Sequence, residues 1–387
     1  MAARGPAKLV RQLVICVALA AVAAGCRTGE ERAAERTVFY PLPPDPPRLQ
    51  YLTALNFSTD ITPEPSALER LVLGEREKLG SESFLIRPYG VAAWQGKIYV
   101  CDYAGAAVKV FDVLHRRYYR LEADKQIFAG PTNLSIDSEG YKYIVESMPR
   151  RLHIFDPQDK YLVTYVIKDG RPGGVVALGA ELYVTDVTHD RILVLDRSSG
   201  KLLRTFGGKG KKPGQFLLPN AIDADAEGYL YVCDQFNNRF QKVDRNGKPI
   251  MAAGKHGDSV GAFARPRGIA VGPDGVVYVV ESVYEVVQMF NQKGQVLMAF
   301  GNYHGAPGFL ELPAGIAVDK SCMSYFSKFV SPKFQMEYLV FVVSQVGHAK
   351  VGVYAFGQLK PGEKIDLLVP KTPAKRAPTS PAPSAGQ

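Results

Sequence analysis

Basic and imidazole side chains gather in three glycine-rich segments of the chain, each of which ends at a proline. Lysine carries a fixed positive charge and histidine titrates near neutral pH, so such a set suits an acidic protein partner or an anionic ligand. The residues are Lys209, Lys211, Lys212, Lys255, His256 and His304. Two interpretations stay open at this point: a docking face, or a solvated loop surface that binds nothing.

Carboxylates follow a regular pattern that separates structural candidates from functional ones. Three of them have an arginine five residues later, which a tight hairpin would bring alongside: Glu146 with Arg151, Asp186 with Arg191, and Asp234 with Arg239. Asp102 and Glu281 have alanine and valine there. These two carboxylates are therefore either ligand contacts or groups that backbone amides satisfy.

Several kinds of site have no motif in this chain. HExxH, CxxC and CxxCH are all absent, so we expect neither a local zinc or dithiol site nor a covalently attached haem. No residues combine a nucleophile with its base, so we assign no catalytic residue. Because the metal and haem motifs are absent, we also expect no metal and no cofactor. Cys101 and Cys233 are expected in buried strands, and the cysteines form no disulfide framework.

A repeat of about 40 to 50 residues positions these groups. Each copy opens with a proline, and a strand-forming tyrosine follows eleven or twelve residues later. The prolines are Pro88, Pro131, Pro172, Pro219, Pro266 and Pro313. The tyrosines are Tyr99, Tyr143, Tyr183, Tyr231, Tyr278 and, in a disturbed sixth copy, Tyr325. Four short strands per copy predict an all-β fold, a six-bladed β-propeller.

This fold gathers the candidate residues on one face. The links between blades and the turns between second and third strands share that face, which holds the basic loops. The residue after each opening proline should lie at the mouth of the central channel. We therefore expect Tyr89, Asn220 and Arg267 to contact a small ligand, with Asp102 and Glu281 as further candidates.

Three segments resemble NHL repeats: Leu218 to Asp223, Leu230 to Arg239, and Leu203 to Phe216. The resemblance covers residues 88–360 and implies a β-propeller. Some propeller lyases of this group place histidines on inner strands around a metal. The expected inner strands here contain no histidine. A metal-dependent lyase or lactonase acting at the channel is therefore the alternative, supported by loop histidines only.

The N-terminus has the features of an export signal. Residues 1–25 combine a basic start, an apolar run too short to span a bilayer, and small residues before Cys26. Gly25-Cys26 resembles the bacterial lipobox, which implies lipidation of Cys26. We expect an envelope lipoprotein anchored in the outer membrane, facing the periplasm or the exterior.

Elements outside the repeats complete the expected organisation. Residues 26–47 form a proline-rich tether and 48–360 the propeller, whose ring is closed by residues 49–55 acting as the fourth strand of the sixth blade. Two short helical insertions are expected, at 66–78 and 321–337. Residues 361–387 lack the apolar content for a core and are expected to be disordered.

Together these features predict a monomeric binding or scaffold module rather than an enzyme. Its partner is an envelope protein or an anionic ligand. By resemblance to propeller lipoproteins of cytochrome-rich bacteria, assembly of exported cytochrome-type complexes is one role. The net charge of +9 is modest for a chain of this length, and we expect no nucleic-acid partner.

Overall fold

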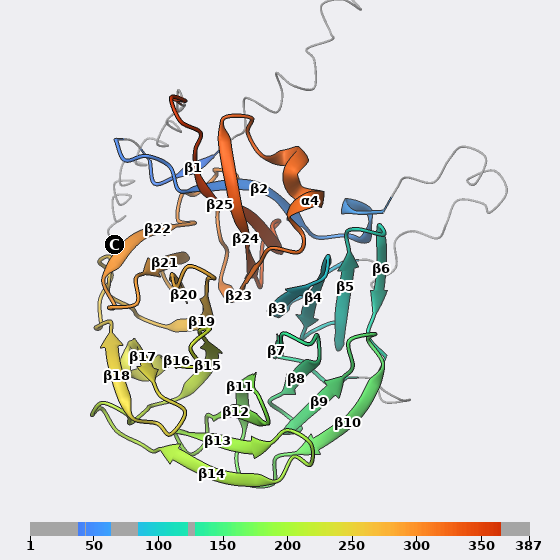
Figure 1. Cartoon of the computed structure of the whole chain (residues 1–387), viewed down its shortest axis with the longest axis vertical. Coiled ribbons are helices and arrows are strands. Elements are labelled where there is room, and N and C mark those ends of the chain that lie inside the picture. Colours follow the sequence, from blue (N-terminus) through green and yellow to red (C-terminus); the bar gives the residue numbers. More distant parts are fainter. Residues whose placement is uncertain (1–37, 43, 63–83, 123–127, 365–387) are drawn as a thin grey trace, which may run out of the picture.

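The computed structural model describes residues 38–42, 44–62, 84–122 and 128–364, which form a closed ring of six antiparallel blades (Figure 1). This confirms the predicted six-bladed β-propeller. The signal segment, Cys26, the 66–78 helix prediction and most of the tail lie outside the described residues. In the described part of the chain, no helix has both the length and the apolar character needed to cross a membrane.

Five blades have four strands each, numbered from the channel outward. Blade one comprises β3 (Pro88–Trp94), β4 (Lys97–Asp102), β5 (Ala107–Asp112) and β6 (Arg117–Arg120). Blade two comprises β7 (Asn133–Ile136), β8 (Lys142–Glu146), β9 (Arg151–Phe155) and β10 (Tyr161–Val166). Blade three comprises β11 (Pro172–Leu178), β12 (Glu181–Asp186), β13 (Arg191–Asp196) and β14 (Leu202–Gly207). Blade four comprises β15 (Pro219–Ala224), β16 (Leu230–Asp234), β17 (Arg239–Val243) and β18 (Pro249–Ala253). Blade five comprises β19 (Pro266–Val271), β20 (Val277–Glu281), β21 (Val286–Phe290) and β22 (Val296–Phe300).

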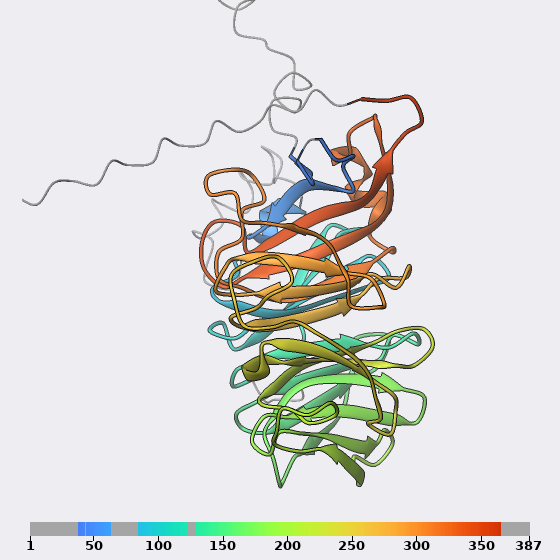
Figure 2. The ribbon, with the colours of Figure 1, turned by 90° about the vertical axis from the view of Figure 1, so that its left-hand side faces the viewer.

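Blade six joins the two ends of the described chain. It comprises β23 (Pro313–Asp319), β24 (Phe334–Ser344), β25 (Val351–Leu359), β2 (Leu49–Leu55) and a short outermost β1 (Phe39–Tyr40). The N-terminal β2 pairs antiparallel with β25, as predicted, and lies beside it in Figure 2. Leu49 packs in the core between blades five and six, whereas Leu55 packs in the core between blades six and one. One strand therefore stabilises both junctions of the closing blade.

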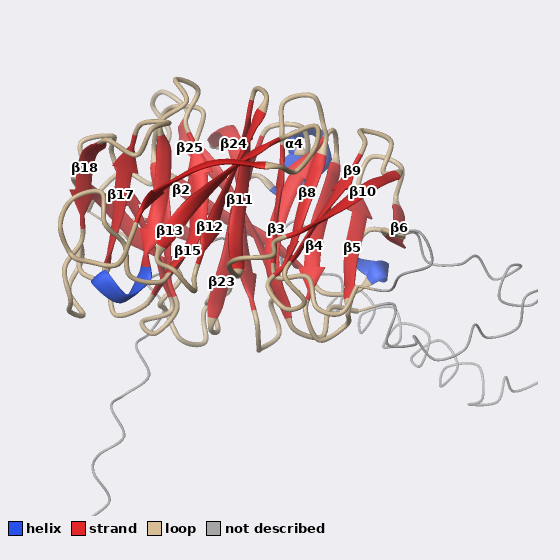
Figure 3. Cartoon of the chain, turned by 90° about the horizontal axis from the view of Figure 1, so that it is seen from below, coloured by secondary structure: helices blue, strands red, loops and turns tan. Residues whose placement is uncertain are grey.

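Helical elements within the described ranges are short and peripheral (Figure 3). They are α4 (Met323–Phe326), continued by η4 (Ser327–Phe329), together with η1 (Ser58–Asp60) and η3 (Gln235–Asn237). The predicted insertion at 321–337 therefore contains a helix, α4, and Phe326 packs against Phe341 of β24 at 6.0 Å between ring centroids. The placement of Tyr325 in the sixth repeat was wrong, because this residue lies in α4. Phe341 is three residues before the end of β24 and holds the position that Tyr278 holds in β20.

The strand-two tyrosines are explained by burial and hydrogen bonding. Second strands are covered on both faces by neighbouring blades, so most of their residues are apolar, whereas β14 is largely exposed. The rings of the tyrosines are fully buried, and four of the hydroxyls bond carboxylates, whereas that of Tyr278 bonds the Tyr338 hydroxyl. Tyr143 donates to Asp137 at 2.9 Å and Tyr231 donates to Asp225 at 3.0 Å. Tyrosine fits here because it fills the core and still satisfies its polar tip.

Candidate functional site in the central channel

The inner strands of all six blades enclose a cavity of about 610 Å³ along the ring axis. Glycines two residues after the opening prolines allow these strands to approach closely. A Cβ atom on Gly315 would lie 2.4 Å from the carbonyl oxygen of Tyr89, and one on Gly268 would lie 2.4 Å from that of Ala314. Larger residues at these two positions would push neighbouring blades apart and distort the channel.

Four arginines line the mouth of this cavity: Arg87, Arg171, Arg265 and Arg267. The first three directly precede the opening prolines of blades one, three and five, so they lie on alternate blades around the ring. The lining contains a single carboxylate, Asp223. The mouth is therefore strongly cationic.

Buried carboxylates position the three alternate arginines through their backbones. Asp102 accepts the amide of Arg87 at 2.8 Å, and Asp186 accepts that of Arg171 at 3.0 Å. Glu281 accepts the amide of Arg265 at 3.0 and 2.8 Å through its two oxygens. Charge-assisted bonds of this kind fix the backbone while leaving each guanidinium free to face the channel.

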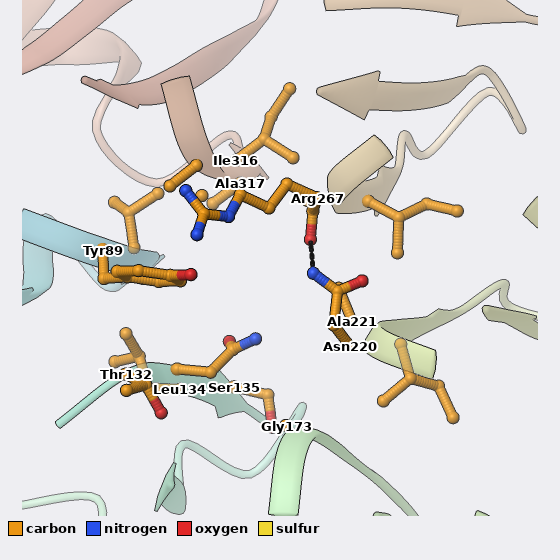
Figure 4. Close-up of a pocket in the computed structure, with 18 of the residues that line it drawn as sticks. Tyr89, Thr132, Leu134, Ser135, Gly173, Asn220, Ala221, Arg267, Ile316 and Ala317 are labelled. Atoms are coloured by element: carbon orange, nitrogen blue, oxygen red, sulfur yellow. Dashed lines mark hydrogen bonds between the residues drawn. The ribbon is translucent and has the colours of Figure 1, made fainter. Parts of the chain in front are cut away.

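Arg267 reaches across the mouth toward blade one (Figure 4). Its guanidinium carbon lies 4.8 Å from the centroid of the Tyr89 ring, and its carbonyl oxygen accepts a hydrogen bond from Asn220 Nδ2 at 2.9 Å. Burial, joined by repulsion from Arg265 and Arg87, lowers the pKa of Arg267. Within the described residues, none of the four mouth arginines forms an ion pair.

Three polar atoms at the mouth are buried but make no hydrogen bond within the described structure: Gln345 Nε2, Arg171 Nε and Asn220 Oδ1. Gln345 is only 1% exposed, and its Oε1 accepts from Arg87 Nε at 3.3 Å. Buried polar groups in folded proteins nearly always have a partner. Two donors and one acceptor among the residues that line the mouth therefore have unused hydrogen-bonding capacity.

A second polar layer lies deeper in the channel. Asp223 of β15 and Ser135 of β7 both line the cavity, and Ser135 Oγ is buried without a partner. Asp223 Oδ2 accepts the Val271 amide at 2.8 Å. Burial raises the pKa of Asp223 from its usual 3.8 to about 6. The amides of Val271 and Ala224 lower this pKa, and the nearby charge of Asp225 raises it slightly.

The predicted ligand contacts divide into two groups. Tyr89, Asn220 and Arg267 line the channel, as expected from their position after the opening prolines. Asp102 and Glu281 are fully buried and are not among the lining residues. Asp102 forms an ion pair with Lys109 at 2.9 Å, and Glu281 accepts the amides of Ala264, Arg265 and Val283. The structure thus gives both carboxylates a positioning role.

The predicted carboxylate–arginine pairs are seen in blades three and four, and the carboxylate of blade two binds a histidine. Asp186 binds Arg191 Nε at 3.0 Å, and Asp234 binds Arg239 Nε at 2.7 Å. Glu146 binds His153 Nε2 at 2.9 Å. His153 is seven residues after the carboxylate, on the same face of the adjacent strand.

The basic residues predicted for a partner-binding face lie in three interblade loops. Lys209, Lys211 and Lys212 are in the β14–β15 loop, Lys255 and His256 in the β18–β19 loop, and His304 in the β22–β23 loop; all six are exposed. Each loop is held by one buried apolar side chain, namely Phe216, Phe263 or Leu310. The three loops leave the same rim of the ring as the arginine-lined mouth.

Metal ligands are sparse in the part of the chain that the structure describes. No group of three His, Cys, Asp or Glu side chains there is close enough to hold a metal ion. The channel lining has one aspartate and neither histidine nor cysteine. The described lining therefore provides no donor set for metal-dependent lyase chemistry.

Sequence reasoning did not place Arg87, Arg171, Arg265 or Asp223 in the channel. The three arginines carried a signal in the sequence, because an arginine directly precedes the opening proline in three of the six copies. They are Arg87, Arg171 and Arg265. Asp223 carried no such signal, because it is an ordinary polar position in a strand of alternating pattern. Its importance comes from the channel that surrounds it.

Comparisons with known proteins support the fold. No protein-family model matches the sequence. The chain is similar to the solved structure of a protein of unknown function from Bacteroides thetaiotaomicron, at 12% identity over 80% of this chain and 75% of that one, with a TM-score of 0.52. It is also similar to a streptogramin B lyase, at 18% identity over 71% and 84% of the two chains, with a TM-score of 0.49. A further similar structure is hydrazine synthase from Kuenenia stuttgartiensis, at 11% identity over 72% and 98%, with a TM-score of 0.47. At 12% identity the likeness to the Bacteroides structure shows a shared fold alone, and activity has to be argued from the site.

Proposed function

We propose that this protein is a binding module whose channel mouth takes up a small anionic molecule bearing a carboxylate or phosphate group. The observation that carries the proposal is Arg267. Its side chain is partly buried, meets repulsion from Arg87 and Arg265, and has no carboxylate partner among the described residues. A partly buried charge without a partner is destabilising, and a bound anion would offset that cost.

The chemistry of the mouth supports this ligand class. Guanidinium groups match carboxylate and phosphate oxygens in two-pronged geometry. Gln345 Nε2 and Arg171 Nε add two buried donors without partners. The cavity of about 610 Å³ falls within the usual range of small-molecule sites, roughly 300–1,000 Å³.

The test is a calorimetric titration of the full chain with octanoate and with inorganic phosphate. Arg267→Gln should weaken binding of the preferred anion by at least about tenfold, which corresponds to about 1.4 kcal/mol. Arg267→Lys should lose less, because it keeps the charge. Lys293→Gln is the matched control, since it removes an exposed charge from a turn on the opposite rim. Equal affinities of wild type and Arg267→Gln, or no binding of either anion at millimolar concentration, would refute the proposal.

Docking of a protein partner on the same face remains a separate prediction. It is supported by the exposed lysines of the β14–β15 loop, which add positive charge on the same rim as the mouth. Replacing Lys209, Lys211 and Lys212 with glutamate should abolish any crosslink to an acidic partner in the native envelope. The same variant should still bind small anions, because none of these lysines lines the channel.

Anchoring in the envelope rests on the sequence alone, through Cys26 and the preceding signal. Labelling of cells with a fatty-acid analogue should mark the wild-type protein and leave Cys26→Ser unmarked. Unchanged labelling of the variant would contradict lipidation at this residue.

A further inference from the structure

The channel has polar groups at two levels and apolar side chains between them. Arg267 and Asn220 occupy equivalent positions at the mouth, and Asp223 lies three residues further along β15. At about 3.3 Å per residue, the two levels are separated by about 10 Å. Ile222, Ile269 and Ile316 belong to the lining between them.

Asp223 has an unusual environment for a carboxylate. One oxygen accepts the Val271 amide, yet no ion pair to Asp223 exists within the described structure. Its acidic neighbour Asp225 is already bound by Lys242 at 3.0 Å. Asp223 therefore lines the cavity as its single carboxylate, held by backbone amides and not neutralised by a basic side chain of the described structure.

Ser135 is at the same level on another blade. Ser135 and Asp223 occupy equivalent positions of β7 and β15, four residues after their opening prolines. The hydroxyl of Ser135 is buried and has no hydrogen-bond partner. Two oxygen-bearing side chains thus line the channel at the same level, from blades two and four.

We propose that Asp223 and Ser135 form a second subsite that binds a protonated amine, so that the channel takes an elongated ω-amino acid. Its carboxylate binds at the arginine-lined mouth, its methylene chain packs against the isoleucines, and its ammonium group binds at the deep layer. This inference rests on the proposed function, because the mouth supplies the site for the anionic end.

An ammonium group fits the deep subsite better than a divalent cation. A single carboxylate balances one positive charge, and no cluster of three acidic, histidine or cysteine side chains exists in the described residues. Ammonium also offers three donors, which suit the carboxylate oxygen, the serine hydroxyl and one water molecule. Divalent cations need more anionic oxygens than this layer supplies.

The experiment compares ω-aminooctanoate, octanoate and suberate by calorimetric titration of the full chain. Wild type should bind ω-aminooctanoate at least about tenfold tighter than octanoate, or about 1.4 kcal/mol. Suberate should bind most weakly, because its second carboxylate meets Asp223. The advantage of the amine should disappear for γ-aminobutyrate against butyrate, since that chain cannot bridge the two layers.

Variants separate the two subsites. Asp223→Asn should make ω-aminooctanoate and octanoate equal, and Ser135→Ala should reduce the difference between them. Arg267→Gln should weaken both ligands alike. Asp258→Asn is the matched control, because it removes an exposed carboxylate from a loop outside the channel. Thermal melting of each variant confirms that it folds.

The outcomes are distinguishable. If wild type binds octanoate and ω-aminooctanoate equally, or if the amine keeps its advantage in Asp223→Asn, the deep subsite is refuted while anion binding at the mouth stands. If wild type binds neither the carboxylates nor inorganic phosphate, the proposed function fails as well.

Discussion

The guanidinium of Arg267 lies over the ring of Tyr89, 4.8 Å from its centroid, and so connects blade five to blade one across the channel mouth (Figure 4). These two blades are separated by blade six, whose residue at this level is the small Ala314. The contact holds the arginine side chain in the channel without neutralising its charge. Positioning of this kind leaves the cation available to a ligand.

Substitution of Tyr89 should therefore change anion affinity in a graded way. Tyr89→Phe keeps the aromatic face and should bind octanoate within about twofold of wild type. Tyr89→Ala removes the face and should weaken binding by roughly 5- to 30-fold, since a desolvated cation–π contact contributes about 1–2 kcal/mol. Calorimetric titration measures both. A loss in the phenylalanine variant as large as that in the alanine variant would assign the effect to the hydroxyl instead.

The buried ion pair of Asp102 and Lys109 supports the position of Arg87. Both side chains are inaccessible to solvent, and Asp102 also holds the Arg87 amide. Lys109→Met should destabilise the fold by about 3–5 kcal/mol, because it leaves an unpaired carboxylate in the core. Chemical denaturation measures the loss. Asp102→Asn combined with Lys109→Met should recover part of it.

Arg117→Met is the control for this pair. Arg117 binds the buried Asp112 at 2.8 Å but is itself 64% exposed, so water screens the interaction and a much smaller loss is expected. Equal losses for Lys109→Met and Arg117→Met would show that burial of the pair is not what stabilises blade one.

Closure of the ring should depend on single residues of β2. Leu49 is fully buried between blades five and six, so Leu49→Ala should lower the free energy of unfolding by about 2–5 kcal/mol. Leu202→Ala on the outer strand β14 is the matched control, because Leu202 is 49% exposed. Denaturant unfolding of the two variants compares them directly. Similar losses would mean that β2 is dispensable for closure.

The sequence was sufficient for the blades because every blade must bury the same faces. Proline and tyrosine recur where strand one opens and where strand two fills the core, and that constraint repeats around the ring. Spacing failed only in blade six, where the inserted helix α4 separates β23 from β24. Tyr325 matched the spacing but lies in the insertion, and Phe341 fills the core position.

The partners of the carboxylates were only partly predictable, because a side chain seven residues later can bind the carboxylate as well as an arginine five residues later. Asp102 lacks an arginine five residues later, yet Lys109, seven residues later, faces it from the adjacent strand. His153 and Gln241 stand at the same spacing from Glu146 and Asp234, and both bind these carboxylates. Glu281 is bound by backbone amides instead. Almost every residue supplies such an amide, so the sequence gives no sign of these partners.

The ionised carboxylate of Asp223 should lower the free energy of unfolding at neutral pH. Its folded-state pKa of about 6 is above its ordinary 3.8, so the folded state binds the proton more tightly than the unfolded chain does. The stabilising effect of that proton is complete below about pH 4 and is lost as the pH rises to about 6. Above pH 6 the penalty stays constant.

Asp223→Asn removes this penalty and still accepts the Val271 amide. The variant should match wild type near pH 4 and exceed its unfolding free energy by roughly 1–3 kcal/mol at pH 7, the upper figure following from about 1.4 kcal/mol per pKa unit. Chemical denaturation across pH 4–8 measures the difference, with Asp258→Asn as control. A purely structural aspartate would give the opposite sign, namely a variant that is less stable at pH 7. A gain in stability together with a loss of ω-aminooctanoate binding would show that the carboxylate is retained for the ligand rather than for the fold.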